Sequence, residues 1–296
     1  MASSLLVPPG ARDLTVGALG GRWRVLAQAG LAPARTPALL IHGGGFDNAS
    51  ISWFHLIEAL GAERPVLAPD LPGCGGTQGV ALAGRADLVA DQLAGLLDAM
   101  GIARVIVCGV SMGGEIALQF GLRHPERTEA VVAIAPGGLL GRFGGPVRNF
   151  GMWLLTRPPE RGMDLISRAS APWIRRSIDR IVRNPLPAPV VEEFVAEAHR
   201  PGTGVAYGTY NRRSFGPFAM TNNLLPYLSG LDAPTLFFHG EDDPMVSIHG
   251  SEAAVALMPD ARLVRVPHCG HWAQLEKPDE FLAAWRRFVG EHHRLG

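Results

Sequence analysis

One short motif of this sequence carries a side chain suited to nucleophilic catalysis. Gly109-Val110-Ser111-Met112-Gly113 is a G-x-S-x-G motif that follows an apolar run and precedes a helical pattern. A serine on such a sharp turn has a strained backbone, and glycine two residues to either side removes the collisions that a Cβ would make. The motif predicts Ser111 as the nucleophile and the N–H of Met112 as a donor to a developing oxyanion.

A second motif, His42-Gly43-Gly44-Gly45, directly follows the apolar run 39–41. Glycines let the backbone approach a substrate oxygen closely, and an HGGG-type loop supplies the second oxyanion donor beside a G-x-S-x-G turn. We predict that the N–H of Gly44 is this donor and that Gly43 lies against the substrate. A flexible glycine turn is the alternative if the run is considered by itself.

A serine hydroxyl needs a base, and the base needs an orienting acid. The segment FFHGEDDPMV follows Ser111 in the chain and offers two neighbouring carboxylates, Asp242 and Asp243. We favour Asp243 as the acid. Asp242 stays open as the alternative, with a turn or a helix cap as its structural role.

The segment VPHCGHWAQL offers two candidate bases, His268 and His271, again after a predicted strand. We favour His271, which follows Gly270. His268, Cys269 and His271 crowd one loop without the second half of a zinc site, so we expect no metal and no cofactor.

Short apolar runs are the elements that must position these residues. Because they are rich in Val, Ile, Leu and Phe on both faces, they predict the buried strands of a mostly parallel sheet, with helices between them. In the helix expected at 86–100, Leu88, Leu93, Leu96, Leu97 and Met100 share one face, and Gly101 follows as a stop. The predicted strands cover residues 39–41, 65–68, 105–108, 130–135, 235–238 and 262–266.

The alternation of strand and helix is interrupted over residues 137–222. This stretch has helical patches and proline breaks but no clear buried strand, so we interpret it as an insertion. It contains 12 Arg against 6 Asp plus Glu, an excess of six positive charges. A solvated helical surface is one explanation of this excess, and a funnel for an anionic substrate is the other. Trp153 and Phe215 are candidates to line an apolar substrate pocket here, with core packing as the alternative.

Composition limits the class of protein and of partner. With 296 residues, 47% of them hydrophobic, the chain fits one large α/β domain with an insertion and is no disordered chain. The 27 basic and 27 acidic residues give no overall charge that favours nucleic acid or a membrane surface. Three unpaired cysteines and an N-terminus without a secretory pattern predict a cytoplasmic protein.

Over nearly its whole length the sequence resembles the α/β-hydrolases, through IHGGG, DLPGCGGT, GVSMGG, GEDD and GHWAQLEKPDEF. The order Ser111, Asp243, His271 is the order of the triad in that superfamily. The resemblance implies an α/β-hydrolase fold, with 1–136 and 223–296 as the core and 137–222 as a helical lid. Within the superfamily, PHCGHWAQLEKPDEF with IHGGG and SMGG resembles the meta-cleavage product hydrolases, which cut carbon–carbon bonds in ring-cleavage dienoates.

The narrower resemblance implies that Trp272, beside the base, lines the substrate. Two features depart from the pattern of these hydrolases. Val110 stands where they usually have an asparagine, and five arginines are candidates for the lid arginine that usually holds the substrate carboxylate. Val110 is thus a candidate substrate contact that favours a less polar or differently shaped substrate. The candidate arginines are Arg168, Arg183, Arg200, Arg212 and Arg213.

These observations predict a cofactor-independent serine hydrolase that acts on a small-molecule carbonyl compound. Carbon–carbon bond cleavage is the first candidate reaction, and ester or lactone hydrolysis is the second. A cyclase, lyase or acyltransferase with the same groups and a noncatalytic binding protein of this fold are the rivals. We expect no nucleic-acid or membrane partner, and a homodimer is left open.

Overall fold

Eight strands form one sheet in the computed structural model, which describes residues 5–29 and 35–292. Their order is β1-β2-β4-β3-β5-β6-β7-β8, and β3 to β8 run parallel to one another while β2 is antiparallel to both of its neighbours. Each of the six predicted strands is confirmed, as β3 to β8. The strands are β1 Arg12–Ala18, β2 Gly21–Gln28, β3 Ala38–Ile41, β4 Val66–Pro69, β5 Val105–Val110, β6 Thr128–Ile134, β7 Thr235–Gly240 and β8 Ala261–Val266.

The sequence analysis missed the hairpin of β1 and β2. Its two strands are joined by Leu19 and Gly20, which both have positive φ, 54° and 76°. Positive φ at both turn positions suits the right-handed twist of a two-residue hairpin. The apolar-run criterion did not find these strands because β1 is mostly exposed and because arginines at 22 and 24 interrupt the apolar residues of β2.

Alternate side chains of the strands enter two separate cores, one on each face of the sheet. Leu40 and Val132 pack with helices α2 and α12, whereas Leu39 and Val131 pack with α3 and α4. The predicted helix 86–100 is confirmed as α3, and Leu93, Leu96 and Leu97 are buried as predicted. Leu88 is 41% exposed, because alanines fill the rest of the buried face. The flanking helices are α1 Ala49–Ser52, α2 Leu56–Gly61, α3 Ala86–Ala99, α4 Met112–Arg123, η1 Pro125–Arg127, η3 Leu225–Gly230, α10 Ile248–Leu257, α11 Ala273–Glu276 and α12 Pro278–His292.

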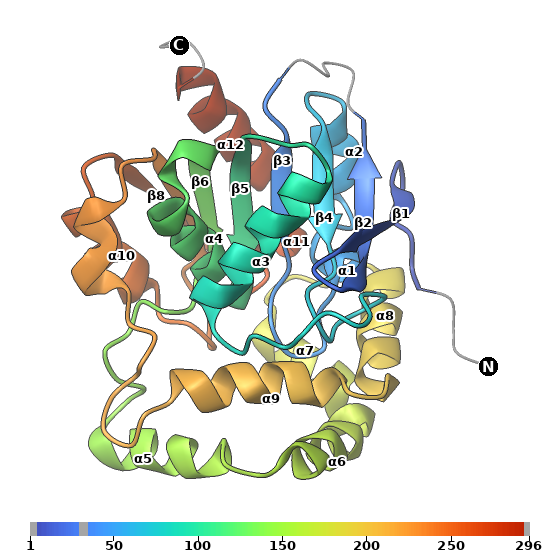
Figure 1. Cartoon of the computed structure of the whole chain (residues 1–296). Coiled ribbons are helices and arrows are strands. Elements are labelled where there is room, and N and C mark those ends of the chain that lie inside the picture. The colour runs from blue at the N-terminus through green and yellow to red at the C-terminus, as the bar shows by residue number, and fades with distance from the viewer. Residues whose placement is uncertain (1–4, 30–34, 293–296) are drawn as a thin grey trace.

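The chain between β6 and β7 forms helices that lie together across one end of the sheet (Figure 1). This is the end at which the parallel strands finish, and the segments after β3 and β5 face these helices. We call residues 137–222 the insertion. Its helices are α5 Pro146–Leu155, α6 Glu160–Ser170, η2 Ala171–Trp173, α7 Ile174–Ile181, α8 Ala188–His199 and α9 Thr203–Ser214.

A buried polar cluster fastens α8 of the insertion to the core. The side-chain amide of Asn48, which caps α1, donates to Glu193 at 3.0 Å and to Glu197 at 2.9 Å. Arg200 donates to both carboxylates and neutralises part of their charge. Both glutamates are at least nine-tenths buried, so losing these hydrogen bonds would leave buried charges without partners. The cluster therefore fixes the position of α8 against the core.

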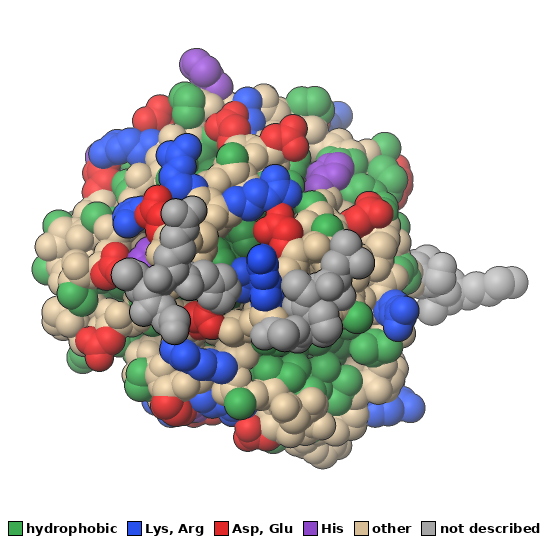
Figure 2. Space-filling model, turned by 90° about the horizontal axis from the view of Figure 1, so that it is seen from above, with side chains coloured by type: hydrophobic (Ala, Val, Ile, Leu, Met, Phe, Trp, Pro, Cys, Tyr) green, Lys and Arg blue, Asp and Glu red, His purple; other side chains and the backbone are tan. Residues whose placement is uncertain are grey.

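The surface at the opposite end of the molecule mixes both signs of charge. Figure 2 views that end, where basic and acidic side chains alternate over the described surface. This agrees with the balanced composition of the chain. No described helix is long and apolar enough to cross a membrane.

The central strands predict where truncation is most costly. Leu40→Ala in β3 removes a side chain that is fully buried, so we expect it to lower the free energy of unfolding by about 3 kcal/mol. Leu14→Ala in β1, where Leu14 is 39% exposed, is the matched control and should cost less than about 1 kcal/mol. Urea unfolding measures both values, and equal losses would contradict the assignment of the core.

Candidate active site

Ser111 lies on a strained turn between β5 and α4. Its backbone has φ 57° and ψ −117°, and its N–H donates to the carbonyl of Ile134 at 2.8 Å. A Cβ on Gly109 would overlap the carbonyl of Gly113, and a Cβ on Gly113 would overlap backbone oxygens at the end of β3. The two glycines of the motif thus allow the close approach that holds Ser111 at the end of the sheet.

The HGGG segment lies directly beside this turn. A Cβ built on Gly43 would lie 3.6 Å from the Cβ of Ser111. The N–H of Gly43 donates to Oδ2 of Asp47 at 2.9 Å, so it is occupied. Within the described ranges the N–H groups of Gly44 and Met112 have no acceptor, as a pair of oxyanion donors requires.

Buried polar contacts fix the shape of the HGGG segment. The N–H of Leu71 donates to Nε2 of His42 at 2.9 Å, so the His42 proton sits on Nδ1 and is donated to the carbonyl of Gly43 at 2.7 Å. Asp47 also accepts from the hydroxyl of Ser52 at 2.7 Å. Burial raises the pKa of Asp47, although its hydrogen bonds act in the opposite direction.

His271 and Asp243 form a buried imidazole–carboxylate pair. Nδ1 of His271 lies 2.7 Å from Oδ2 of Asp243, and the side chains are 4% and 1% exposed. Burial by itself would raise the pKa of Asp243, but the attraction of His271 and several hydrogen bonds outweigh it and hold that pKa well below its usual range. The Asp243 carboxylate is therefore ionised and accepts a hydrogen bond. Nδ1 of His271 carries the proton of that hydrogen bond.

The neighbours of these two residues are placed differently. Asp242 is exposed, and its N–H donates to the carbonyl of Cys269 at 3.0 Å. His268 is exposed and has a positive φ of 50°. The geometry thus favours Asp243 and His271, the residues preferred from the sequence.

Ser111 and His271 follow β5 and β8 at the same end of the sheet. The described residues contain no hydrogen bond between these two side chains. Catalytic hydrogen bonds often tighten only when substrate is bound. The roles of Ser111, His271 and Asp243 stay predictions.

Sequence reasoning gave no role to His239, which contacts the same carboxylate. This fully buried imidazole donates from Nε2 to the carbonyl of Val246 at 3.0 Å, and Nε2 also lies 3.4 Å from Oδ2 of Asp243. Its Nδ1 accepts from Ser251 at 2.9 Å. The sequence does contain a signal for this contact, because His239 lies near the end of β7 and only four residues before Asp243.

The predicted substrate contacts have different surroundings. Trp272 packs edge-on against His271 and Phe194, with ring centroids 5.6 and 4.9 Å apart. Val110 is fully buried in the same core as Trp272.

Trp153 and Phe215 pack against other residues of the insertion. Phe150 and Arg157 contact the ring of Trp153, and Phe143 packs edge-on against Phe215. Neither lines a cavity described below. Their contact with substrate, like that of Trp272 and Val110, stays a prediction.

Among the cavities between the core and the insertion, three border the predicted site or one another. A crevice of about 30 Å³ is lined by both predicted oxyanion residues, Gly44 and Met112. It shares Gly45 and Tyr207 with an apolar chamber of about 250 Å³ inside the insertion. It shares Arg85 and Ala86 with a polar cavity of about 490 Å³ on its other side.

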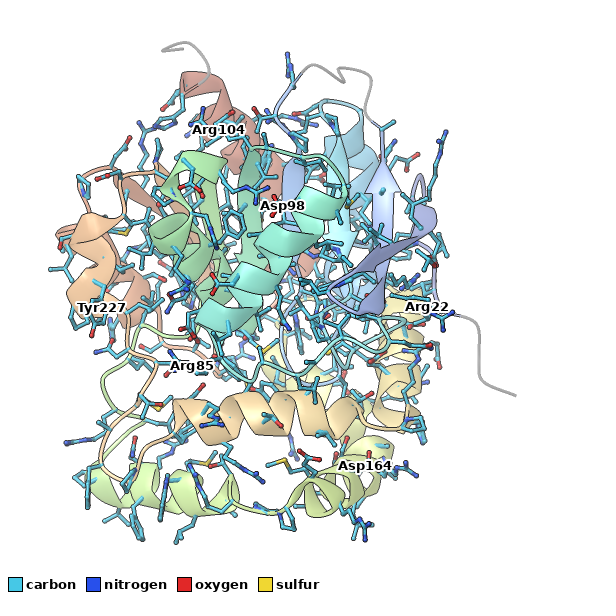
Figure 3. The ribbon with its side chains drawn as sticks, viewed as in Figure 1. Arg22, Arg85, Asp98, Arg104, Asp164 and Tyr227 are labelled. Carbon is cyan, nitrogen blue, oxygen red and sulfur yellow. The ribbon has the colours of Figure 1, made fainter. Side chains whose placement is uncertain are left out.

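The polar cavity lies between α3 and the end of the insertion. Figure 3 labels two of its lining residues, Arg85 between α3 and α9, and Tyr227 near α10. Arg213 and Glu115 also line it. Arg85 is paired with Asp87 at 2.6 Å.

Glu115 connects the first turn of α4 to the insertion. Its Oε2 accepts from the hydroxyl of Tyr210 in α9 and, at 2.7 Å, from the amide of Asn222. Burial raises the pKa of Glu115 to about 7, although both hydrogen bonds lower it. The sequence analysis did not single out these three residues, because their contact depends on chain segments about 100 residues apart.

A family model with the description "alpha/beta hydrolase fold" matches residues 37–278. The chain belongs to the alpha/beta hydrolase fold family. This confirms the resemblance seen in the sequence, and the eight-stranded sheet confirms the predicted fold class. With its named hydrolase relatives, the match identifies the chain as a hydrolase.

Several curated relatives of this hydrolase share most of its length. It is 30% identical over 261 residues to a 2-hydroxy-6-oxo-6-phenylhexa-2,4-dienoate hydrolase of Burkholderia cepacia, covering 82% of this chain and 84% of the relative. It is 29% identical, with the same coverage, to a 2-hydroxy-6-oxononadienedioate/2-hydroxy-6-oxononatrienedioate hydrolase of Comamonas testosteroni. These relatives are meta-cleavage product hydrolases, as the narrower resemblance implies.

Solved structures support the fold. The phenylhexadienoate hydrolase of Rhodococcus sp. strain RHA1 superposes with a TM-score of 0.76 at 24% identity, covering 96% of this chain and 99% of that one. A putative lipase of Acinetobacter baumannii AYE superposes with a TM-score of 0.78 at 19% identity, covering 97% and 93%. At such identities the likeness shows only the shared architecture.

Glu115 predicts a pH dependence of stability. Because its folded pKa of about 7 exceeds the ordinary value of 4.5, the unfolded chain ionises first as pH rises, and stability falls between these values. Glu115→Gln should remove this pH-dependent loss of stability. From pH 5 to pH 8 its free energy of unfolding should therefore rise, relative to that of wild type, by up to about 3 kcal/mol. Urea unfolding at both pH values measures it, with the exposed Glu126→Gln as the control; parallel pH profiles for Glu115→Gln and wild type would contradict the prediction.

Proposed function

We propose that this hydrolase works through a Ser111–His271–Asp243 triad. Ser111 attacks a carbonyl carbon while Nε2 of His271 takes its proton, and Asp243 orients the imidazole and stabilises its charged form. The N–H groups of Gly44 and Met112 hold the oxyanion. The buried 2.7 Å contact between His271 and Asp243, together with the unoccupied N–H groups beside Ser111, supports this proposal.

We propose carbon–carbon bond cleavage in a dienoate as the reaction. When the tetrahedral intermediate collapses, the bond between the former carbonyl carbon and its neighbour breaks, and the leaving carbon takes the proton from His271. Water, deprotonated by His271, then releases the acyl group from Ser111. The polar cavity that borders the crevice carries this proposal, because it offers an arginine to the carboxylate that such a substrate has at one end.

We assign the carboxylate contact to Arg213. Four of the five candidate arginines are engaged elsewhere. Arg213 alone among these five, within the described part of the chain, has a side chain without a hydrogen bond or ion pair, and it lines the polar cavity. Arg168 pairs with Asp164, Arg200 with Glu193 and Glu197, and Arg183 and Arg212 donate to backbone carbonyls.

Ester or lactone hydrolysis is the second candidate. The apolar chamber favours it, since no residue that lines this cavity is charged. The charge of Arg85 in the polar cavity is also offset by Asp87. An uncharged ester would use the same triad and need no carboxylate contact.

We further propose that the insertion serves as a lid and that the enzyme works in the cytoplasm. The contacts of Tyr207 with the HGGG segment support the first statement. Three free, buried cysteines support the second, because a reducing compartment keeps thiols unpaired.

The nucleophile is tested by covalent labelling. Ser111→Ala should abolish labelling by a fluorophosphonate probe, because the probe reacts only with an activated serine, and should lower turnover by at least about 10⁴-fold. Ser177→Ala, on the exposed face of α7, is the matched control and should label like wild type. Persistent labelling of Ser111→Ala would refute the triad.

The carboxylate contact is tested with two substrates. Arg213→Ala should lower kcat/KM for 2-hydroxy-6-oxo-2,4-heptadienoate by about 10-fold to 100-fold and leave p-nitrophenyl acetate unchanged, because only the dienoate carries a carboxylate. Arg168→Ala is the control. Equal losses on both substrates would remove Arg213 from substrate binding, and a wild-type enzyme that hydrolyses only the ester would favour the second candidate.

A further inference from the structure

Tyr207, in α9 of the insertion, covers the predicted oxyanion loop. Its ring lies so close to Gly44 that a Cβ at position 44 would overlap the ring carbons. The three atoms nearest to that Cβ position all belong to the Tyr207 ring. The ring therefore forms the wall above one of the two predicted oxyanion donors.

The same ring separates two of the three cavities. On one side is the crevice at Gly44 and Met112, whose volume of about 30 Å³ holds one or two water molecules. On the other side is the apolar chamber of about 250 Å³. Since the two cavities share Gly45 and Tyr207, and glycine has no side chain, the Tyr207 ring is the side-chain part of the wall between them.

The chamber has the size and chemistry of a site for an uncharged organic group. Its apolar lining comes from Phe46, Leu155, Met163 and Ile166, with only uncharged polar residues beside them. An apolar cavity of about 150 Å³ is large enough to bind benzene. The chamber could therefore hold a phenyl group, but the Tyr207 ring stands between it and the oxyanion position.

Contacts to the core hold this ring in place. Tyr207 stacks on Tyr210, with ring centroids 6.0 Å apart and planes 14° from parallel, and its hydroxyl is hydrogen bonded to Asn211. Tyr210 in turn donates to Glu115, in the first turn of the helix that follows Ser111. The position of the Tyr207 ring is thus linked to the core through Tyr210.

We propose that Tyr207 is a specificity-determining residue that limits the size of the group on the reacting carbonyl. The ring admits a small alkyl group beside Gly44 and bars a phenyl group from the chamber. Replacing it by a small residue joins the crevice to the chamber and lets an aryl ketone bind. This inference rests on the proposed function, since it takes Ser111 and Gly44 as the reacting centre.

The test compares two dienoates that differ only at this carbonyl. The substrates are 2-hydroxy-6-oxo-2,4-heptadienoate, with a methyl group, and 2-hydroxy-6-oxo-6-phenylhexa-2,4-dienoate. Wild type should prefer the methyl ketone, and Tyr207→Ala should raise the phenyl-to-methyl ratio of kcat/KM by at least about 10-fold. Tyr207→Phe keeps the ring and should stay within about twofold of the wild-type ratio.

Phe218→Ala is the matched control, because Phe218 is an insertion aromatic that is 74% exposed and lines none of the three cavities. If Tyr207→Ala does not fold, Tyr207→Leu removes the ring with a smaller loss of volume. An unchanged ratio in a folded variant, or equal losses on both ketones, would overturn the proposal.

The same measurements distinguish a wrong assignment of the reaction from a wrong assignment of Tyr207. If wild type cleaves neither dienoate, carbon–carbon cleavage is refuted. The same ratio is then measured with p-nitrophenyl benzoate and p-nitrophenyl acetate, which place a phenyl or a methyl group on an ester carbonyl. A ratio that rises at least about 10-fold in Tyr207→Ala supports the role of Tyr207, and an unchanged ratio overturns it.

Discussion

The candidate site depends on one close backbone contact, where the start of α4 meets the end of β3. Gly113 lies against the carbonyl oxygens of Ile41 and His42 with no room for a Cβ. This contact lets the chain reverse direction immediately after β5, with Ser111 in a conformation that ordinary residues avoid. On either side of β5, β3 is fully buried and β6 is buried except at Glu129, so the packed sheet stabilises this strained turn.

Two further strands contribute the remaining chemistry at the same edge of the sheet. Parallel strands bring their carboxyl ends together, so loops far apart in sequence meet there. His271 and Asp243 meet by this route, and His239 adds a second buried imidazole to the carboxylate. An ionised carboxylate with these contacts holds His271 in one tautomer, which is the form that a general base needs.

Several hydrogen bonds tie the insertion to this end of the sheet, and three of them lie close to the predicted site. Asn48 binds the glutamates of α8, Glu115 binds Tyr210 of α9, and the N–H of His271 donates to Ile181 of α7 at 3.3 Å. Each contact joins the insertion to a segment next to a predicted catalytic residue. The position of α9, and with it that of the Tyr207 ring, is therefore coupled to the geometry of the site.

From the sequence alone we predicted the six strands that the structure confirms as β3 to β8 and a sharp turn at Ser111 after β5. Continuous apolar runs and glycine spacing are local properties, so they can be read from neighbouring residues. The edge hairpin of β1 and β2 was missed because its mostly exposed first strand has no such run.

The tertiary structure adds that Asp243 and His271, which the sequence analysis favoured, have buried side chains, whereas Asp242 and His268 are exposed. One residue along a loop turns a side chain from the buried edge to solvent, and no local pattern records which side chain is buried. The same reason applies to Glu115, to Tyr207 and to Arg213, whose side chain has no hydrogen bond or ion pair with the residues that the structure describes. Their partners, or the absence of partners, depend on how the insertion packs on the core, which long-range contacts decide.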